Sequence, residues 1–499
     1  MSSTPATRRH LVFACLMLAM FMVAIEATVV ATAMPQIVAR LGGFQLYAWV
    51  FSGFLLTQTA TTVMFGKLAD LYGRKPVMIA GLVVFLIGSV AAGFSWSMGS
   101  LIGFRLLQGL GAGAIQPTSM TIVSDLYTLD ERRRTQSYMA TVWGVSAVIG
   151  PLAGAFIVQH ISWAWVFWIN VPLGVLAVAG MALFLHEKVE HHSRSIDWGG
   201  ALLFTIAVSA LLLAISPTSG GGILTHPLVF AAIAVLAAPA FLFWERRVPE
   251  PMMDVELWSQ PTIASANAAT LAAGLGLIGL TACLPIYIQA VLGLTPIVSG
   301  LTLTSMAVGW PIAATVSARL LLPMWGLRTT FRGGAVLIVI GGAAFPFLGL
   351  GQDGLWLSSA GAFLMGAGMG MMSYTAILLL QASVEWNRRG AATASNVFAR
   401  LLGNTLGAAV MGAILNLGLH LAGANVSADQ IRVLMDRTGG AAMKAADPAL
   451  KAALAGSLHW VFVAMFVLGV ATLAAAWAMP QPGIEEPFRR KAAQPSPAE

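Results

Sequence analysis

Charged residues are scarce in this chain. Asp, Glu, Lys and Arg together make up 9% of its 499 residues, whereas soluble domains carry about 25%. Apolar residues account for 58% of the sequence. Because so little polar surface is available, the chain cannot face water on all sides and is expected to use lipid as most of its solvent. The composition therefore argues against an ordinary soluble enzyme or binding domain.

Several familiar sites are also missing. The two cysteines, Cys15 and Cys283, lie in separate apolar runs and are predicted to be small core residues. No G-x-x-x-x-G-K-[ST] segment occurs, so the chain contains no P-loop ATP motor. GLGLIG at 274–279 matches the dinucleotide-binding pattern G-x-G-x-x-G, but no strand precedes it. It is interpreted as a site of close helix packing by small residues. HEKVEHH at 186–192 lacks zinc-site spacing and is interpreted as a solvated loop. We expect no metal and no cofactor.

Long apolar runs, in contrast, are abundant. A helix that spans a bilayer needs about 20 apolar residues. Fourteen runs meet this length, in groups of six, two and six, which predicts an all-α integral membrane protein with two six-helix halves and two extra helices. The predicted spans are 11–34, 46–66, 77–96, 99–124, 136–159, 163–185, 197–215, 227–244, 262–291, 298–322, 331–350, 355–381, 390–419 and 457–479.

The positions of the cations predict the orientation. If the N-terminus is cytoplasmic, 20 of the 27 Lys and Arg residues fall in cytoplasmic segments and only five in outer ones. This asymmetry is typical of the positive-inside rule. The net charge of +7 is therefore interpreted as a topology signal and not as a nucleic-acid surface. Both termini are expected in the cytoplasm.

The charged linkers divide the chain into predicted domains. These are a first six-helix half over 1–190, two inserted helices over 191–255 and a second half over 256–482, which includes an outer loop at 420–456. Residues 483–499 are predicted to form a disordered cytoplasmic tail.

Three ionisable side chains are predicted deep inside spans: Glu26, Arg105 and Arg400. With about 100° between successive helical residues, each shares one helix face with other polar or small residues, so that face is expected to turn inward. The faces comprise Cys15, Ala19, Met22, Glu26 and Ala33; Arg105, Gln108, Ala112 and Gln116; and Asn396, Arg400, Gly403, Asn404 and Gly407.

The roles of these groups have alternatives. Glu26 is interpreted as a proton or substrate site, the alternative being a permanently protonated structural residue. Arg105 is either structural or part of a proton relay, and Arg400 is interpreted as structural. The candidates for lining a central cavity are Met22, Asn267, Asn396, Arg400 and Asn404.

One loop carries a specific family resemblance. GKLADLYGRK at 66–75 resembles the loop signature between the second and third spans of the major facilitator superfamily. Other segments resemble motifs of its 14-span drug:proton antiporters, in the same order along the chain. They are IEATVVATAMP at 25–35, RLLQGLGAGAIQP at 105–117, GVSAVIGPLAGA at 144–155, WAWVFWINVPLG at 163–174 and NRRGAATASNVFARLLGNTLGAA at 387–409.

The chain departs from the family pattern at three places. Glu26 replaces the usual Asp, Ala155 replaces a Gly, and the second-half counterpart of the loop at 317–328 lacks its Asp. The resemblance implies an inner gate in which Asp70 caps a second-half helix near Gly390. The gate and antiporter-motif residues that it implies are Gly66, Asp70, Gly73, Arg74, Lys75 and Asp125, and Gly144, Gly150, Pro151 and Gly154. Arg74 is expected to meet Asp125.

The resemblance implies a transporter and not an enzyme. It implies export of amphipathic, cationic small molecules in exchange for protons by alternating access, with Glu26, Arg105, Gln108 and Gln116 as coupling or substrate residues. Two alternatives are an exporter of one endogenous metabolite (a lipid, siderophore or peptide) and a membrane receptor that transports nothing. The expected setting is the plasma (inner) membrane, as a monomer whose partners are small molecules, protons and lipid.

Overall fold

The structure is a computed structural model that describes residues 8–127, 129–187, 197–215, 226–249, 251, 255–347, 353–385, 389–422 and 448–480. Within these ranges all regular structure is helical, as the sequence predicts. A helix satisfies its backbone hydrogen bonds within one segment, which lipid requires of a spanning element. The predicted tail 483–499, most of the outer loop 420–456 and the linker at 188–196 lie outside the described residues.

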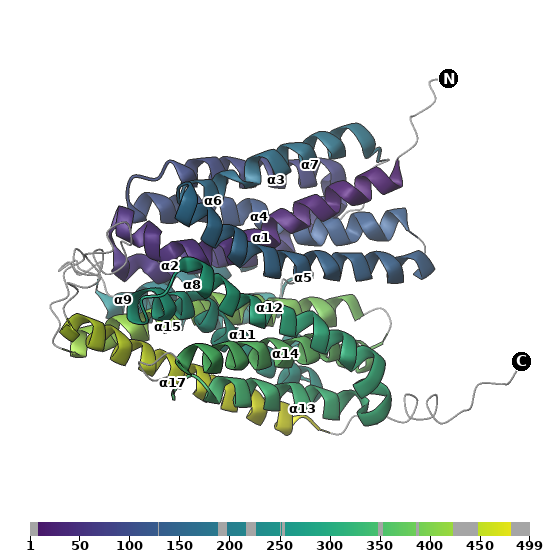
Figure 1. Cartoon of the computed structure of the whole chain (residues 1–499). Coiled ribbons are helices and arrows are strands. Elements are labelled where there is room, and N and C mark those ends of the chain that lie inside the picture. The colour runs from purple at the N-terminus through teal and green to yellow at the C-terminus, as the bar shows by residue number, and fades with distance from the viewer. Residues whose placement is uncertain are drawn as a thin grey trace, which may run out of the picture. The chain divides into compact units, whose positions relative to one another are not determined.

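The helices follow one another along the chain, and every predicted span contains at least one of them (Figure 1). The first group is α1 (Arg9–Leu41), α2 (Tyr47–Tyr72), α3 (Arg74–Gly93), α4 (Met98–Leu126), α5 (Leu129–His160), α6 (Trp165–Trp168) and α7 (Asn170–Phe184). The others are α8 (Trp198–Ile215), α9 (Pro227–Glu245), α10 (Val255–Ser259), α11 (Pro261–Ile286), α12 (Pro296–Val316), α13 (Leu322–Ala343), α14 (Asp353–Ala382), α15 (Arg389–Leu421) and α17 (Pro448–Ala478). Three short elements are η1 (Phe44–Leu46), η3 (Tyr287–Val291) and η4 (Ser317–Leu321).

Ten of the described helical segments are long and apolar enough to cross a membrane. One of them, Pro296–Ala343, has 48 residues and overlaps two predicted spans, and Gly326 interrupts its helical backbone with a φ of 76°. Two shorter apolar helices are Gly144–His160 and Trp198–Ala214. The chain is a multi-pass membrane protein, and the number of fourteen spans stays a prediction.

The turn between α2 and α3 is tighter than the sequence predicts. The predicted span ends at residue 66, but α2 continues to Tyr72 and only Gly73 separates it from α3. Residues 67–72 include Lys, Ala and two Leu, which favour helix over loop. Gly73 has a φ of 95°, a conformation that side chains with a Cβ rarely adopt. The helix therefore extends through most of the signature loop.

The chain forms two compact units. Unit 1 comprises Met1–Met252, Pro285–Leu301 and Ala408–Ser457, and unit 2 comprises Met253–Leu284, Thr302–Gly407 and Leu458–Glu499. The predicted domain boundaries at 190, 255 and 482 follow the linkers in sequence and stay predictions.

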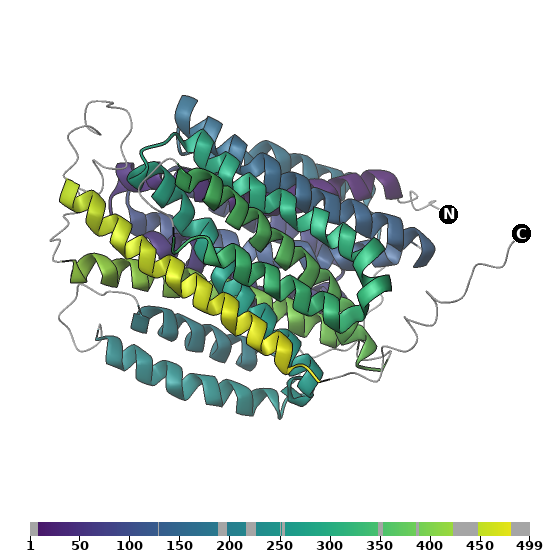
Figure 2. The same cartoon turned by 60° about the horizontal axis from the view of Figure 1, so that its bottom comes forward.

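In unit 1, α4 packs against α2 and α3, and α1 packs against α5 and α7. The core between these helices is aliphatic and aromatic; Leu16, Phe85 and Met181 are examples of its fully buried side chains. Helices α8 and α9 lie side by side, as the teal pair in Figure 2 shows, and α8 also contacts α2. The inserted helices thus belong to unit 1.

In unit 2, α13 and α14 pack closely along their length. Glycines permit this: a Cβ at Gly341 would lie 2.7 Å from the carbonyl oxygen of Gly361, and a Cβ at Gly334 would lie 2.8 Å from that of Gly368. Small residues at helix contacts are typical of membrane proteins, since they let backbones approach.

Candidate functional site

Glu26 lies in the middle of α1 and is buried. Its exposed fraction is 1%, and that of Arg105 on α4 is also 1%. Arg105 donates a hydrogen bond from Nη1 to Glu26 Oε1, which makes a buried ion pair. An isolated charge is very unfavourable in a low-dielectric interior, and a counter-charge offsets this. The sequence predicted both residues on inward faces, and the structure brings the two side chains together.

The ion pair belongs to a closed ring of five side chains. Arg105 Nη1 also donates to Gln108 Oε1 at 2.6 Å, and Gln108 Nε2 donates to Ser89 Oγ at 3.2 Å. Asn170 Nδ2 donates to the same Ser89 oxygen at 3.0 Å and to Glu26 Oε2, which completes the ring. We call these five residues the proton-site ring; they come from α1, α3, α4 and α7, which contact one another in unit 1 (Figure 1).

The donors and acceptors of the proton-site ring fit an ionised Glu26. Arg105 can only donate, so Gln108 must turn its oxygen toward Arg105 and its NH₂ toward Ser89. Ser89 accepts two hydrogen bonds and donates its own hydrogen to the carbonyl oxygen of Phe167 at 2.8 Å. Both oxygens of Glu26 then accept from N–H groups. No proton on the carboxylate is needed to complete this arrangement.

The Arg105 guanidinium is also held by its surroundings. Its Nε donates to the carbonyl oxygen of Val50 at 3.3 Å. Its central carbon lies 4.2 Å from the centroid of the Phe54 ring, within reach of a cation–π interaction. These contacts orient the cation toward Glu26; the structural and the relay role of Arg105 both stay predictions.

Glycine seams place the helices that carry the proton-site ring. A Cβ at Gly88 on α3 would lie 2.6 Å from the backbone nitrogen of Gln108, so the missing side chain lets α4 approach Ser89. In the antiporter motif, Gly150 on α5 faces Thr28 of α1, and a Cβ at Gly154 would lie 2.7 Å from the carbonyl oxygen of Val29.

The rest of the antiporter motif lies in the same helix. Gly150 and Gly154 both pack against residues of α1 that lie within two helical turns of Glu26. Gly144 is half-buried, and α5 continues as one helix through Pro151. The described residues therefore show a close α1–α5 contact at this motif, without the helix break that the proline favours.

Ion pairs surround the start of α3. Arg74 Nε lies 3.2 Å from Asp125 Oδ2, as the sequence predicts, and Arg74 Nη1 lies 3.4 Å from Glu187 Oε1. Glu187 also accepts from the backbone N–H groups of Arg74 and Lys75, each at 2.9 Å. It therefore caps α3 at the positive end of the helix dipole, from a residue outside any helix; most of the HEKVEHH segment lies outside the described residues.

The proposed gate contact of Asp70 lies outside the described side chains, as do the side chains near Gly390. Lys75 is described and donates from Nζ to the carbonyl oxygen of Ala182 at 2.7 Å. The structure therefore shows the α3 side of the signature loop, and the gate role of Asp70 stays a prediction.

Unit 2 contains a neutral polar cluster between α11 and α15, which we call the amide cluster. Asn396 Nδ2 donates to Asn267 Oδ1 and to Thr270 Oγ1, both at 3.0 Å. Asn267 Nδ2 donates to Ser395 Oγ at 3.0 Å. Because these groups satisfy one another, the cluster joins two helices, and a role of Asn267 and Asn396 in lining a cavity stays a prediction.

The seam beside the amide cluster confirms the packing interpretation of GLGLIG. A Cβ at Gly274 would lie 3.0 Å from the carbonyl oxygen of Arg400 and 3.0 Å from Asn404 Oδ1. The side chain of Arg400 is half-buried and makes no hydrogen bond or ion pair with any residue in the described ranges. Met22 is fully buried in the core of unit 1, whereas Gln116 is partly exposed.

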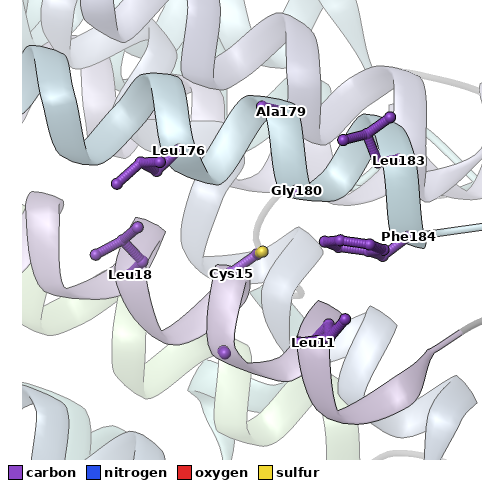
Figure 3. Close-up of a pocket in the computed structure, with 9 residues that line it drawn as sticks. Leu11, Cys15, Leu18, Leu176, Ala179, Gly180, Leu183 and Phe184 are labelled. Atoms are coloured by element: carbon purple, nitrogen blue, oxygen red, sulfur yellow. The ribbon is translucent and has the colours of Figure 1, made fainter.

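A groove on the outside of unit 1 is unrelated to these residues. It lies between α1 and α7, has a volume of about 430 Å³ and is lined by apolar side chains such as Leu11, Leu18, Leu176 and Leu183 (Figure 3). No residue of the proton-site ring lines it. An apolar outer surface of this kind suits contact with lipid tails.

Two ring members, Ser89 and Asn170, were not predicted from the sequence. Ser89 is one hydroxyl in an apolar run, and Asn170 lies within WAWVFWINVPLG, where it drew no separate attention. Both are fully buried. A lone Asn inside an apolar, Trp-rich segment is a signal that could have been followed, because a buried amide needs partners.

The long apolar helices and the glycine seams between them are those of a multi-pass membrane protein. The family model of the Major Facilitator Superfamily matches residues 16–408. The chain belongs to this superfamily, whose members are transporters and not enzymes. The resemblance seen in the sequence is thereby confirmed at the level of the superfamily.

Similar proteins agree with this assignment. Multidrug resistance protein 3 of Bacillus subtilis (strain 168) is 34% identical over 418 residues, which cover 80% of this chain and 78% of that protein. Multidrug transporter protein MdtP of the same organism is 32% identical over 414 residues, which cover 82% and 76%. A bacterial homologue of the human lysosomal transporter Spinster, in an inward-facing and unoccupied conformation, shares the fold with a TM-score of 0.64 and 16% identity over 96% of this chain and 98% of that one.

Proposed function

We propose that this chain exports amphipathic small molecules, cationic ones among them, in exchange for protons across the plasma (inner) membrane. The observation that carries the proposal is the buried pair of Glu26 and Arg105. An ionisable residue inside a membrane span is energetically costly. Such residues are therefore rare, and they commonly mark proton or substrate paths. The names of the two bacterial relatives support export of drugs.

Protonation of Glu26 supplies the coupling step. When Glu26 takes up a proton it becomes neutral, and Arg105 is left as a buried cation without its counter-charge. A buried charge that loses its partner is strongly destabilising. Protonation therefore favours a rearrangement of α1 and α4 in which Arg105 finds another partner, and loss of the proton favours the arrangement described above. This is how one proton can change the balance between two conformations.

The access of protons to the Glu26 carboxylate must change during the transport cycle. The exposed fraction of Glu26 is 1%, so water does not reach the carboxylate in the described state. We infer that another state opens a path to it, and that rocking of two halves about a central site provides this change. Both termini then lie in the cytoplasm, as the distribution of cations indicates.

In the described state, a cationic substrate cannot contact the Glu26 carboxylate directly. Both oxygens of Glu26 already accept hydrogen bonds, so a cation can contact the carboxylate only after Arg105 or Asn170 has moved. We therefore propose that proton and substrate bind in different conformations of the same unit. In this scheme Arg105, Gln108 and Gln116 belong to the coupling path.

One proton for each monovalent cation is the proposed stoichiometry. Of the acids in the described helices, Glu26 is the one that lies more than two turns from a helix end. Exchange of one proton for one monovalent cation moves no net charge, so a membrane potential of 100 mV, worth about 2.3 kcal/mol per charge, contributes nothing. A gradient of one pH unit contributes about 1.4 kcal/mol.

Transport by purified protein in liposomes tests the proposal. A pH gradient is imposed while potassium and valinomycin hold the membrane potential at zero, and uphill movement of a fluorescent monovalent cation is followed. We expect transport by the parent and by Glu245→Gln, a control at a second buried acid, and none by Glu26→Gln. Uphill transport by Glu26→Gln, or absence of pH-driven transport in the parent, would contradict the proposal.

A further inference from the structure

Asn170 is the member of the proton-site ring with unused hydrogen-bonding capacity. It is the first residue of α7 and is fully buried. Its Nδ2 donates both of its hydrogens, one to Glu26 Oε2 and one to Ser89 Oγ. Its Oδ1 is buried and has no hydrogen-bond partner among the described residues. Buried polar atoms are nearly always paired, so an orphaned carbonyl oxygen beside a carboxylate calls for a reason.

Protonated Glu26 requires an acceptor. In the ionised state the carboxylate accepts from Arg105 and from the Nδ2 group of Asn170, and neither of these N–H donors can accept a hydrogen bond in return. Gln108, which also lies against the carboxylate, already uses its oxygen to accept from Arg105. A proton on Oε2 would therefore point at the Nδ2 hydrogens of Asn170. Oδ1 of the same amide is a buried acceptor with no hydrogen-bond partner among the described residues. A half-turn about the Cβ–Cγ bond of Asn170 exchanges the two ends of the amide.

We propose that Asn170 reads the protonation state of Glu26 by this half-turn, donating from Nδ2 to the ionised carboxylate and accepting at Oδ1 from the protonated one. The inference rests on the proposed function, because it assumes that Glu26 gains and loses a proton. Asn170 acts through Glu26 and is a positioning residue. Arg105 is the other ionisable group that acts on Glu26 in the described structure; α3 and α7 present neutral groups to the ring, Ser89 and Asn170.

The half-turn passes the signal to the junction of α6 and α7. After it, Ser89 no longer receives a hydrogen bond from Asn170 and can turn its own hydrogen from the Phe167 carbonyl to Asn170 Oδ1. Phe167 belongs to α6, and Asn170 begins α7 directly after Ile169, which keeps helical backbone angles. Pro172 has no N–H to donate to the preceding turn, so the junction lacks one helical hydrogen bond. Protonation of Glu26 thus removes a contact at the junction between α6 and α7.

The test is an infrared measurement on purified protein in liposomes. Difference spectra between acidic and alkaline buffer are recorded, and subtraction of the Glu26→Gln spectrum isolates the carbonyl stretch of protonated Glu26. The variants are Asn170→Leu, which removes donor and acceptor at similar volume, and Asn170→Thr, whose hydroxyl can both donate and accept. Asn396→Leu, which removes a buried amide from the amide cluster of unit 2, is the matched control.

We expect the Glu26 band of the parent and of Asn396→Leu at the position of a hydrogen-bonded acid. In Asn170→Leu the band should move to the higher wavenumber of an acid without an acceptor, and pH-driven transport should fall about tenfold, as for loss of one hydrogen bond to a charged group. Asn170→Thr should restore part of both, which keeps the test valid if the Leu variant does not fold.

The outcomes separate the two levels of inference. If Asn170→Leu and Asn170→Thr leave the band at the parent position while Glu26→Gln abolishes coupling, the acceptor lies elsewhere and this inference is wrong, although the proposed function stands. If the parent shows no Glu26 band that changes between acidic and alkaline buffer, the proposed function itself fails.

Discussion

The proton-site ring of unit 1 and the amide cluster of unit 2 are both buried polar networks that join membrane helices. The first joins four helices and includes a carboxylate with a guanidinium. The second joins α11 and α15 through amides and hydroxyls alone. Only the first contains a group that can change charge.

This difference separates function from packing. Two paired amides satisfy each other and hold one geometry, so the amide cluster has no chemical reason to change during a transport cycle. The ring around Glu26 is balanced for one protonation state and unbalanced for the other. A protein with both kinds of network can assign proton chemistry to one unit and keep the other network as a fixed helix contact.

Removal of Arg105 should have the largest effect. Arg105→Met leaves the Glu26 carboxylate buried without a counter-charge, which typically destabilises a protein by about 3–5 kcal/mol. Arg400→Met, the matched change in unit 2, removes a cation that has no ion-pair partner in the described ranges, so its effect should be about 1 kcal/mol or less. Thermal unfolding of both variants in detergent measures the difference. Equal losses would contradict the contrast between the two regions.

Neutralisation of both charges should recover most of that loss. Replacing both members of a buried ion pair by apolar residues of similar volume is often close to neutral for stability, so Glu26→Leu combined with Arg105→Met should unfold near the parent temperature. The same double variant should show no pH-driven transport. If it unfolds as early as Arg105→Met, the unpaired carboxylate is not the source of the instability.

Asn396→Leu tests the amide cluster of unit 2 in the same comparison. Loss of this amide leaves Asn267 Oδ1 without its donor, a change that typically costs about 1–3 kcal/mol of stability. The pH dependence of transport, measured at a temperature where the variant is folded, should match that of the parent. A shifted pH profile would mean that the amide cluster also takes part in coupling.

The smallest effect is expected at the start of α3. Arg74 pairs there with Asp125 and Glu187, and the side chains of these three residues are 24%, 47% and 13% exposed. Exposed ion pairs contribute about 1 kcal/mol or less and weaken in salt. Arg74→Met should therefore lower stability slightly, and the difference from the parent should shrink as salt is added. A large, salt-independent loss would assign Arg74 a role in the core.

The sequence alone predicted much of this arrangement. Long apolar runs have one stable solution in lipid, so the helices around Glu26, Arg105 and Asn396 follow from composition. Helical periodicity placed Arg105 and Gln108 on one face. Both predictions depend on short distances along the chain, where pattern and structure correspond.

The remaining features depend on contacts between distant helices. Ser89 and Asn170 join the ring only because α3, α4 and α7 pack together, which no local pattern shows. The cap that Glu187 makes on α3 also joins residues more than a hundred positions apart. The predicted end of the second span at residue 66 came too early, because helix-forming neighbours outweigh one glycine.

The central claim is that Glu26 releases a proton when substrate binds. The most direct measurement is proton release from purified protein in weakly buffered detergent, followed with a pH indicator as a cationic substrate is added. The parent and the control Glu245→Gln should release about one proton per bound cation, because Glu26 is the one acid that lies deep inside a described helix. Glu26→Gln should bind without releasing one. Release by Glu26→Gln equal to that of the parent would show that the coupling site lies elsewhere and that Glu26 is a structural residue.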